Sequence, residues 1–249
     1  MNQDMRAGRQ FLKSAEWETF GTLGTDQQRG VPPPPLEKPA PPDAALFDLV
    51  PPAQFTSGTM PLIEVIGKRR SRRKYTDSAL ALEELSFLLW SCQGIEKVAN
   101  AARAFRTVPS AGCRHPFETY ILANRVEGLA PALYRYLPVE HKLCLVSAAP
   151  GLAQAIHAAS EEQYVLESAA TFIWTAIPYR TEWRYLHHSH RVMLMDIGHA
   201  CQNLYLAAES IGCGTCALGA YDQKWMDEAL GVDGEEEFTV YLAPVGRVA

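Results

Sequence analysis

Long apolar runs are missing from this sequence, because no stretch of 18 or more apolar residues occurs in its 249 positions. This absence excludes a segment that could span a membrane as a helix. Residues 1–13 also lack the apolar core of a secretory signal, since charged residues are scattered through them. We therefore expect a cytoplasmic protein without a membrane partner.

Four common fingerprints are absent as well. The sequence has no G-x-G-x-x-G opening a helix after a strand, no G-x-x-x-x-G-K-S/T, no G-x-S-x-G and no H-E-x-x-H. Rossmann, P-loop, α/β-hydrolase and zinc-protease interpretations thus have no motif to rest on.

Cysteine is too sparse for a disulfide framework, with six residues scattered over the whole chain. The pair Cys213 and Cys216 has C-x-x-C spacing, but no second pair and no H-x-x-x-H follows it. The spacing favours two small packed residues over a redox pair, and a redox pair over zinc. We predict no metal site.

The composition is that of an ordinary globular protein, at 47% hydrophobic and 20% charged residues. Nine of the 17 prolines lie between positions 32 and 52, which predicts either an extended arm along another surface or a disordered linker. Helical and strand patterns then alternate without an internal repeat. We expect an α+β fold, with an N-terminal helix and proline-rich arm over 1–60 and a single domain over 61–249.

Periodicity predicts the individual elements of this domain. Helices are expected over 1–20, 82–92, 151–167, 190–211 and 223–230, and strands over 117–124, 132–137, 142–147, 169–177 and 238–245.

The basic segment, residues 68–74, carries six of the chain's 23 Lys and Arg, although the formal net charge is -5. So dense a cation cluster repels itself unless an anion offsets it, and guanidinium forks suit phosphate oxygens. A solvated charge run is the alternative. A nucleic-acid site is disfavoured by the acidic net charge and by the lack of clustered aromatic residues beside the segment.

Five short motifs follow one another between residue 61 and the C-terminal end. They are R-R-S-R-R-K-Y at 69–75, P-S-A-G at 109–112, D-I-G-H with Q-N-L within 196–204, G-T-C-A-L-G-A at 214–220 and P-V-G-R at 244–247. Together, in this order and spacing, they resemble the nitroreductase family of flavin enzymes, and within it the SagB-type dehydrogenase branch. The resemblance implies an FMN-binding α+β fold with a mainly antiparallel central sheet flanked by helices, and an intertwined homodimer with both flavin sites at the subunit interface.

The resemblance also implies roles for single residues. Arg69 and Ser71 match positions that hold the FMN phosphate, Arg247 reaches it from the far end of the chain, and Arg73 matches a cation beside N1 and O2 of the flavin ring. A fixed cation there stabilises the negative charge that reduction places on the ring. Arg70 is included in this predicted set, with plain surface charge as its alternative.

Two further stretches are implied to contact the cofactor. Pro109, Ser110, Ala111 and Gly112 match a turn that packs on the ring and the ribityl chain. The second stretch is Leu218, Gly219 and Ala220, in which the last two turn their backbone N–H groups toward N5 and O4. Small residues allow that close approach.

The sequence departs from the family pattern at two places. Cys113 and His115 stand where many members carry Asn and Gln, so those flavin contacts are not expected here. The candidate catalytic pair is Arg184 and Tyr185, which match a Lys-Tyr pair of SagB-type azoline dehydrogenases. Because Arg holds its proton too tightly to act as a base, the pair favours another flavin chemistry over thiazoline oxidation.

The resemblance therefore predicts an FMN-dependent oxidoreductase that transfers hydride through flavin N5, with NADH or NADPH as reductant and a small organic molecule as substrate. The expected partners are that small molecule and a second copy of the chain, without nucleic acid. A flavin-binding or corrin-binding protein of the same fold without turnover is the alternative.

Overall fold

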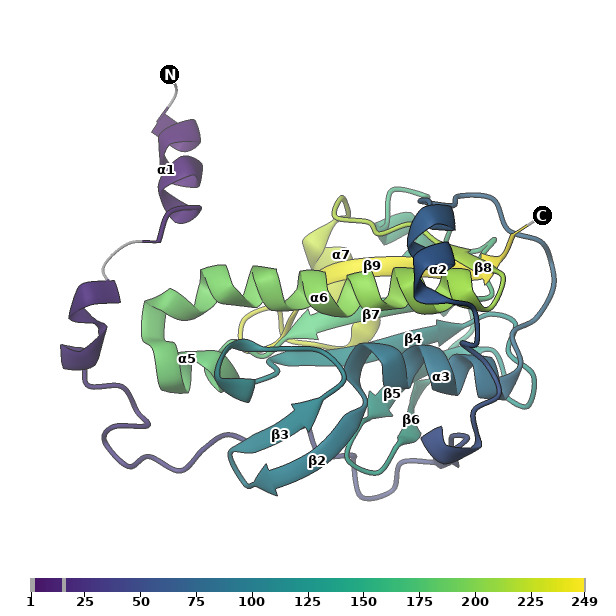
Figure 1. Cartoon of the computed structure of the whole chain (residues 1–249). Helices are drawn as coiled ribbons and strands as arrows, with labels where there is room; N and C mark the ends of the chain where they lie inside the picture. The colour runs from purple at the N-terminus through teal and green to yellow at the C-terminus, as the bar shows by residue number, and fades with distance from the viewer. Residues whose placement is uncertain (1–2, 15–16, 249) are drawn as a thin grey trace.

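The computed structural model describes residues 3–14 and 17–248, and its centre is a seven-stranded sheet (Figure 1). The strand order is β1-β6-β5-β4-β7-β9-β8, and every ladder between neighbours is antiparallel. The strands are β1 (Leu46–Asp48), β4 (Phe117–Ala123), β5 (Ala132–Leu137), β6 (Lys142–Ser147), β7 (Ala170–Ala176), β8 (Cys213–Thr215) and β9 (Phe238–Arg247).

Continuous apolar sequence explains the middle of the sheet. β4 and β7 are buried along their whole lengths, as expected for strands covered on both faces. They pair from Phe117 opposite Ala176 to Ala123 opposite Ala170. The strands predicted over 117–124, 132–137, 142–147 and 169–177 are confirmed to within a residue at each end, and the last predicted strand extends to Arg247.

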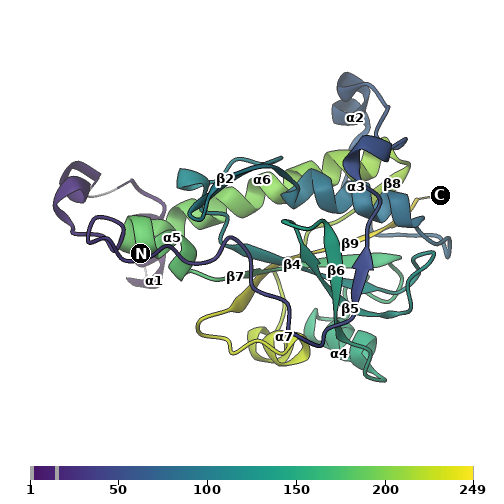
Figure 2. The same cartoon turned by 90° about the horizontal axis from the view of Figure 1, so that it is seen from below.

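Helices cover both faces of the sheet and give the molecule three layers (Figure 2). α3 (Leu82–Gln93) and α6 (Ser189–Ser210) pack together on one face, while α4 (Leu152–Ala159) and α7 (Gln223–Leu230) pack together on the other. Each face has its own core cluster. The neighbouring residues Phe172 and Ile173 of β7 enter different clusters, because successive strand side chains point to opposite faces.

Shorter elements lie around these layers. They are α1 (Gln3–Phe11), α2 (Leu62–Lys68), α5 (Tyr179–Tyr185), the hairpin of β2 (Ile95–Asn100) and β3 (Arg103–Arg106), and 3-10 helices at Trp17–Thr22, Pro52–Gln54, Ala111–Cys113 and Leu186–His188. The sequence patterns did not predict α2, α5, β8 or the hairpin, which are too short for a clear periodicity. No helix in the described part of the chain is long and apolar enough to cross a bilayer.

The proline-rich arm is ordered along the domain. Its strand β1 pairs with β6 at the edge of the sheet. Arg135 donates hydrogen bonds to the carbonyls of Lys38 (2.6 Å) and Pro39 (2.9 Å), and Arg106 donates to the carbonyl of Leu36 (2.8 Å). Because proline has no N–H, this part of the arm cannot form a complete β-ladder. Its carbonyls accept hydrogen bonds from buried guanidinium groups instead. Of the two expectations for this segment, the extended arm is the one observed.

Two predicted helices are shorter than expected. The helix predicted over 1–20 ends at Phe11. Of its predicted apolar stripe, Phe11 and Leu12 are exposed, Ala15 lies outside the described residues, and Phe20 is half-buried against Tyr185. The helix predicted over 151–167 ends at Ala159. The chain then passes through positive φ angles at 161, 162 and 164, which brings the fully buried Val165 into the core before β7 begins.

Candidate functional site

The basic segment lies along the outer edge of β8. Ser71 forms a parallel β-bridge with Thr215, and the Arg72 amide donates a 2.9 Å hydrogen bond to the Thr215 carbonyl. The Tyr75 hydroxyl donates to the Arg72 carbonyl at 2.8 Å. The sheet edge therefore fixes the backbone of the basic segment, and with it the positions from which its side chains project.

Two glycines make room for this arrangement. Gly214 of β8 and Gly246 of β9 lie opposite each other in the ladder. A Cβ on Gly214 would come within 2.4 Å of the Arg72 side chain, and a Cβ on Gly246 within 2.9 Å of Tyr75. Only glycine at both positions lets the basic segment lie this close to the sheet.

Some cations of the basic segment are already neutralised or hydrogen-bonded within the protein. Lys68 forms an ion pair with Glu64 at 2.9 Å. Arg70 is exposed, and its guanidinium donates to the carbonyls of Gly67 (3.0 Å) and Arg69 (2.7 Å). Arg70 thus has fewer free donors for a ligand than Arg69 or Arg73.

The other cations are uncommitted. Within the described residues, no oxygen accepts a hydrogen bond from the side chains of Arg69, Arg73 or Lys74. The Arg69 guanidinium lies 5.4 Å from the ring centroid of Tyr205, over its face. A hollow of about 330 Å³ opens at this place, lined by Ser71, Arg72, Arg73, Lys74 and Val248.

Hydrogen-bond donors around the hollow are also unused. The Tyr205 hydroxyl accepts from the Ala217 amide (2.8 Å) and lies 3.2 Å from Ser71 Oγ, so it can donate its own proton to Ser71. The Ser71 proton is then free to point at a ligand. In addition, Nε of Arg72, which lines the hollow, is buried without a partner in the described structure. Donors that lack acceptors, together with uncommitted cations, fit an anionic group such as a phosphate.

Arg247 was predicted to reach the same phosphate. Its backbone carbonyl accepts from the Thr76 amide at 2.9 Å, so the residue lies beside the end of the basic segment. Its guanidinium forms an ion pair with Glu84 and donates to the Ile211 carbonyl at 2.5 Å. Glu84 therefore neutralises the charge of Arg247, and a role of Arg247 at a phosphate stays a prediction.

The glycine corner after β8 is open. Leu218 is buried and exchanges backbone hydrogen bonds with Leu242 of β9, at 2.8 and 3.2 Å. Gly219 and Ala220, which follow it, are exposed, and a Cβ on Gly219 would meet no atom within 4 Å. Residues 215–220 thus run from the uncommitted cations to a corner with free space beside its backbone.

The predicted turn at 109–112 is held by α6. Ser110 Oγ donates to Asp196 Oδ2 at 2.6 Å, and the Ala111 amide donates to the same oxygen at 3.0 Å. Ser110 Oγ also accepts from the His115 amide at 2.9 Å. Burial raises the pKa of Asp196, while the hydrogen bonds from Ser110 and Ala111 oppose that shift. Pro109 is exposed at the start of this turn.

The candidate catalytic pair lies against the same turn. Gly112 has φ 60°, and a Cβ on it would come within 2.7 Å of the Tyr185 hydroxyl and 2.8 Å of the Arg184 side chain. Arg184 donates to Gln27 Oε1 at 2.8 Å, and its Cζ lies 5.3 Å from the Tyr185 ring centroid. The fold thus brings the predicted turn and the predicted pair together across about 70 residues of sequence.

The basic segment and the 109–112 turn are separate in one chain. Tyr205 contacts the basic segment, and Asp196 contacts the turn. These two residues are nine positions apart in α6, which corresponds to about 13 Å along the helix axis. Figure 1 shows α5 at one end of α6, and α2 and β8 at the other. The basic segment and the 109–112 turn therefore lie at two different places along α6 in one chain.

Cys213, Cys216 and His115 are buried. Cys213 and Cys216 are buried free thiols in core clusters on opposite faces of the sheet, which agrees with packing and not with a pair. Burial raises the pKa of Cys213 to about 12. Burial and then the charge of Arg106 lower the pKa of His115 to about 3, so its ring stays neutral and enclosed.

Sequence reasoning assigned no role to Tyr205, Glu84, Asp196 or Thr215, although they hold the predicted residues in place. Asp196 stands within a quoted motif, and Thr215 lies in the glycine-dense stretch, so both could have been noticed. Nothing in the sequence marks Glu84 as a partner of Arg247, since 163 positions separate them.

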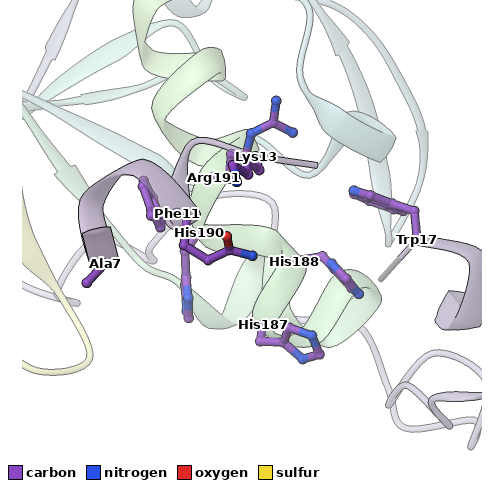
Figure 3. A pocket seen from close by; sticks show the side chains of 9 residues that line it. Ala7, Phe11, Lys13, Trp17, His187, His188, His190 and Arg191 are labelled. Carbon is purple, nitrogen blue, oxygen red and sulfur yellow. The ribbon is translucent and has the colours of Figure 1, made fainter. Parts of the chain in front are cut away.

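A further hollow of about 420 Å³ lies between α1 and the start of α6 (Figure 3). His187, His188, His190, Trp17 and Phe11 are among its lining residues, and Trp17 stacks on His188 with the ring centroids 4.7 Å apart. None of the residues that line it belongs to the predicted site.

A sequence profile described as the nitroreductase family matches residues 66–247 of this chain. The chain belongs to the nitroreductase family. The matched range includes the basic segment, the 109–112 turn, the glycine corner and Arg247.

Relatives agree with this membership. A nitroreductase-named protein of Methanocaldococcus jannaschii is 34% identical over 186 residues, which cover 75% of this chain and 90% of that protein. The trifolitoxin-processing protein of Rhizobium leguminosarum bv. trifolii is 33% identical over 147 residues, or 56% of this chain and 39% of the relative.

Solved structures show the same nitroreductase-like fold. A nitroreductase-named structure from Ralstonia eutropha aligns with a TM-score of 0.67 at 23% identity, over 87% of this chain and 98% of that one. A chain of the microcin synthetase complex of E. coli aligns with a TM-score of 0.62 at 18% identity, over 86% of this chain and 78% of that one. The α+β fold expected from the sequence is thereby confirmed.

Proposed function

We propose that this nitroreductase-family protein is an FMN-dependent oxidoreductase of the SagB-type dehydrogenase branch, which acts on a small organic molecule with NADH or NADPH as reductant. The observation that carries the proposal is the group of uncommitted donors at the β8 edge. Arg69, Arg73 and Lys74 have no acceptor within the described residues, and the Ser71 hydroxyl is free to donate.

The phosphate of FMN fits that edge by charge and by donor geometry. Hydrogen bonds between a guanidinium and a phosphate are roughly twice as strong as neutral ones. Arg69 is pre-oriented by the face of Tyr205, and Ser71 by its bridge to Thr215, so few side-chain rotamers remain to be fixed on binding. An anion here also relieves the mutual repulsion of the cations.

FMN, when bound, supplies hydride transfer through N5 of its ring. The residues of this chain would bind and tune it. Arg73 would place a positive charge beside the ring edge that becomes negative on reduction, and the open backbone at Gly219 and Ala220 would approach the ring without a side chain in the way. Arg184 and Tyr185 would border the substrate side through their contact with Gly112.

A homodimer would account for the separation of the basic segment from the 109–112 turn, which we call the two half-sites of this proposal. If one copy supplies the basic segment and its partner supplies the 109–112 turn, each dimer contains two complete sites. Exposed apolar side chains on α2 and α6 agree with a second copy in contact there: Leu62, Ile63, Ile66, Leu194 and Met195 are each at least 45% exposed.

Two comparisons and one residue bear on the branch and the substrate. One relative is named for trifolitoxin processing, and one structural neighbour is part of a microcin synthetase complex with a truncated pro-microcin. Arg184 replaces the Lys that the azoline dehydrogenases carry, and a guanidinium keeps its proton at neutral pH. We therefore favour a substrate from which this chain need not abstract a proton with a strong base.

The visible spectrum of the purified protein tests the flavin proposal. A flavin band with maxima in the visible range, retained through gel filtration or restored by added FMN, is the expected result. A protein that stays colourless after incubation with FMN contradicts the proposal. Bound flavin that neither NADH nor NADPH reduces would instead favour a flavin-binding protein without turnover.

Mixed dimers test the two half-sites. Arg69→Ala damages the basic segment and Gly112→Ala damages the turn, so homodimers of either variant should retain little flavin. When differently tagged copies of the two variants are co-expressed, the doubly tagged dimer should regain one flavin, because one of its sites is intact. Dimers of two differently tagged copies of the same variant are the control. Absence of flavin from the mixed dimer would show that both stretches act within one chain.

A further inference from the structure

A hollow of about 300 Å³ lies beside the 109–112 turn, between the β2-β3 hairpin and α5. It is lined by Gln27, Asn100, Ala102, Arg103, Gly112, Arg114, Trp183 and Arg184. Three guanidinium groups and two amide side chains line it, and the lining contains no carboxylate. In a chain of net charge -5, such a one-sided lining is a distinct electrostatic feature.

The three guanidinium groups are held to different degrees. Arg114 is buried, donates to the Arg180 carbonyl at 2.7 Å and lies over the Trp183 ring at 4.8 Å from the centroid. Arg184 donates to Gln27, but its Nε is buried with no partner in the described structure. Arg103 is exposed, and its side chain has no acceptor within the same residues. Donor capacity therefore remains on at least two of the three.

The positive charges of these arginines also repel one another. Burial, then the charges of Arg184 and Arg180, lower the pKa of Arg114 to about 10. Arg114 stays protonated at neutral pH, so the hollow keeps its positive charge until an anion enters. Trp183 is buried beneath Arg114, whose guanidinium lies over its ring.

We propose that this hollow binds the carboxylate of an organic acid substrate, with Arg103 and Arg184 as its ligands. Because Gly112 lines the hollow, an acid anchored there lies next to the turn assigned above to the flavin. In this way the inference rests on the proposed function, and it narrows the substrate class to carboxylates. A planar carboxylate accepts two parallel hydrogen bonds from a guanidinium, which a neutral amide of the same shape cannot do.

Direct binding to the full-length protein tests this, with phenylacetate as the probe and phenylacetamide as its neutral counterpart. Calorimetry should show saturable binding of phenylacetate and at least about tenfold weaker binding of the amide. Arg103→Gln should weaken phenylacetate binding about tenfold without changing the FMN content. Lys97→Gln is the matched control, because Lys97 is exposed on the same hairpin and does not line the hollow.

Three results would overturn the inference: no saturable phenylacetate binding, equal binding of the amide, or unchanged affinity in Arg103→Gln. The flavin spectrum is read on the same samples. Arg103-dependent binding in a protein that takes up no FMN would keep the carboxylate site and refute the flavin function. A protein that binds flavin but not phenylacetate would keep the flavin function and refute the carboxylate site.

Discussion

The Ser110 hydroxyl and the Asp196 carboxylate lie 2.6 Å apart, although 86 positions separate them in the sequence. The same carboxylate accepts from the Ala111 amide. This contact ties the turn to the middle of α6, the longest helix of the described chain. The place of the 109–112 turn is thereby set by the fold rather than by the local loop sequence.

Removing this anchor should loosen the turn. Asp196→Ala leaves the Ser110 hydroxyl and the Ala111 amide without their acceptor, so we expect a loss of about 1–3 kcal/mol in the free energy of unfolding. Hydrogen exchange of the Ala111 amide should accelerate at least about tenfold, since the amide loses a protected hydrogen bond. Gln202→Ala, at an exposed position of the same helix, is the control and should change neither quantity. Equal effects of the two variants would contradict the anchoring role.

Arg69 and Arg73 should affect different properties of the flavin. Arg69→Ala removes a phosphate ligand, so we expect FMN affinity to fall at least about tenfold with little change in reduction potential. Arg73→Ala removes a cation beside the ring, so we expect the potential to fall more than the affinity. Titration with FMN and a spectroscopic potential measurement separate the two. Lys68→Ala, whose side chain is paired with Glu64, serves as the control.

If Arg69→Ala and Arg73→Ala changed FMN affinity and reduction potential to the same extent, the assigned roles would be refuted.

Glu84 should limit the contribution of Arg247. Glu84→Gln removes the charge that neutralises Arg247 and keeps an acceptor for the Ala81 amide, which now donates to Glu84 at 2.9 Å. FMN affinity should therefore rise about threefold, as expected for the release of one partly exposed ion pair. Glu83→Gln, in the same first turn of α3, should leave the affinity unchanged. A lower affinity in Glu84→Gln would mean that Glu84 orients Arg247 rather than restrains it.

Much of the fold follows from local sequence, while the site does not. β4 to β7 are fully or largely apolar runs bounded by turn residues, and α6 carries a clear helical repeat, so these elements were predictable. The hairpin β2-β3 is mostly exposed and polar, and no periodicity marks it. Motif order gave the basic segment and the 109–112 turn as predicted cofactor-binding stretches. Their separation along α6, the pairing of Arg247 with Glu84 and the arginine-lined hollow depend on contacts between distant segments, which periodicity cannot supply.

The buried carboxylate of Glu118 should make the free energy of unfolding depend on pH. It is 2% exposed and accepts from Arg135 (2.8 Å), Arg180 (2.5 Å) and the Lys38 amide (2.8 Å). Burial by itself would raise the pKa of Glu118, but the charges of Arg180 and Arg135 lower it below the ordinary value of 4.5. The unfolded chain therefore binds more protons as the pH falls below 4.5, and the stabilisation by Glu118 is lost over that range.

Chemical denaturation between pH 3 and pH 7 checks this dependence. Glu118→Gln should cost about 3–5 kcal/mol at pH 7, because it leaves two buried guanidinium groups without their counterion. The deficit should shrink as the pH falls below 4.5. Glu237→Gln offers a comparison at a second buried carboxylate, which is paired with the partly exposed Lys38. A deficit that is constant over the whole range would contradict the lowered pKa.

Comparison of FMN with riboflavin tests most directly whether the basic segment holds a phosphate. The two molecules differ only in that group, so fluorescence titration of the apoprotein with each isolates its contribution. We predict that FMN binds at least about 100-fold more tightly than riboflavin, as two charge-assisted hydrogen bonds require, and that Arg69→Ala removes most of this difference. Equal affinity for FMN and riboflavin in the unmodified protein would contradict the account.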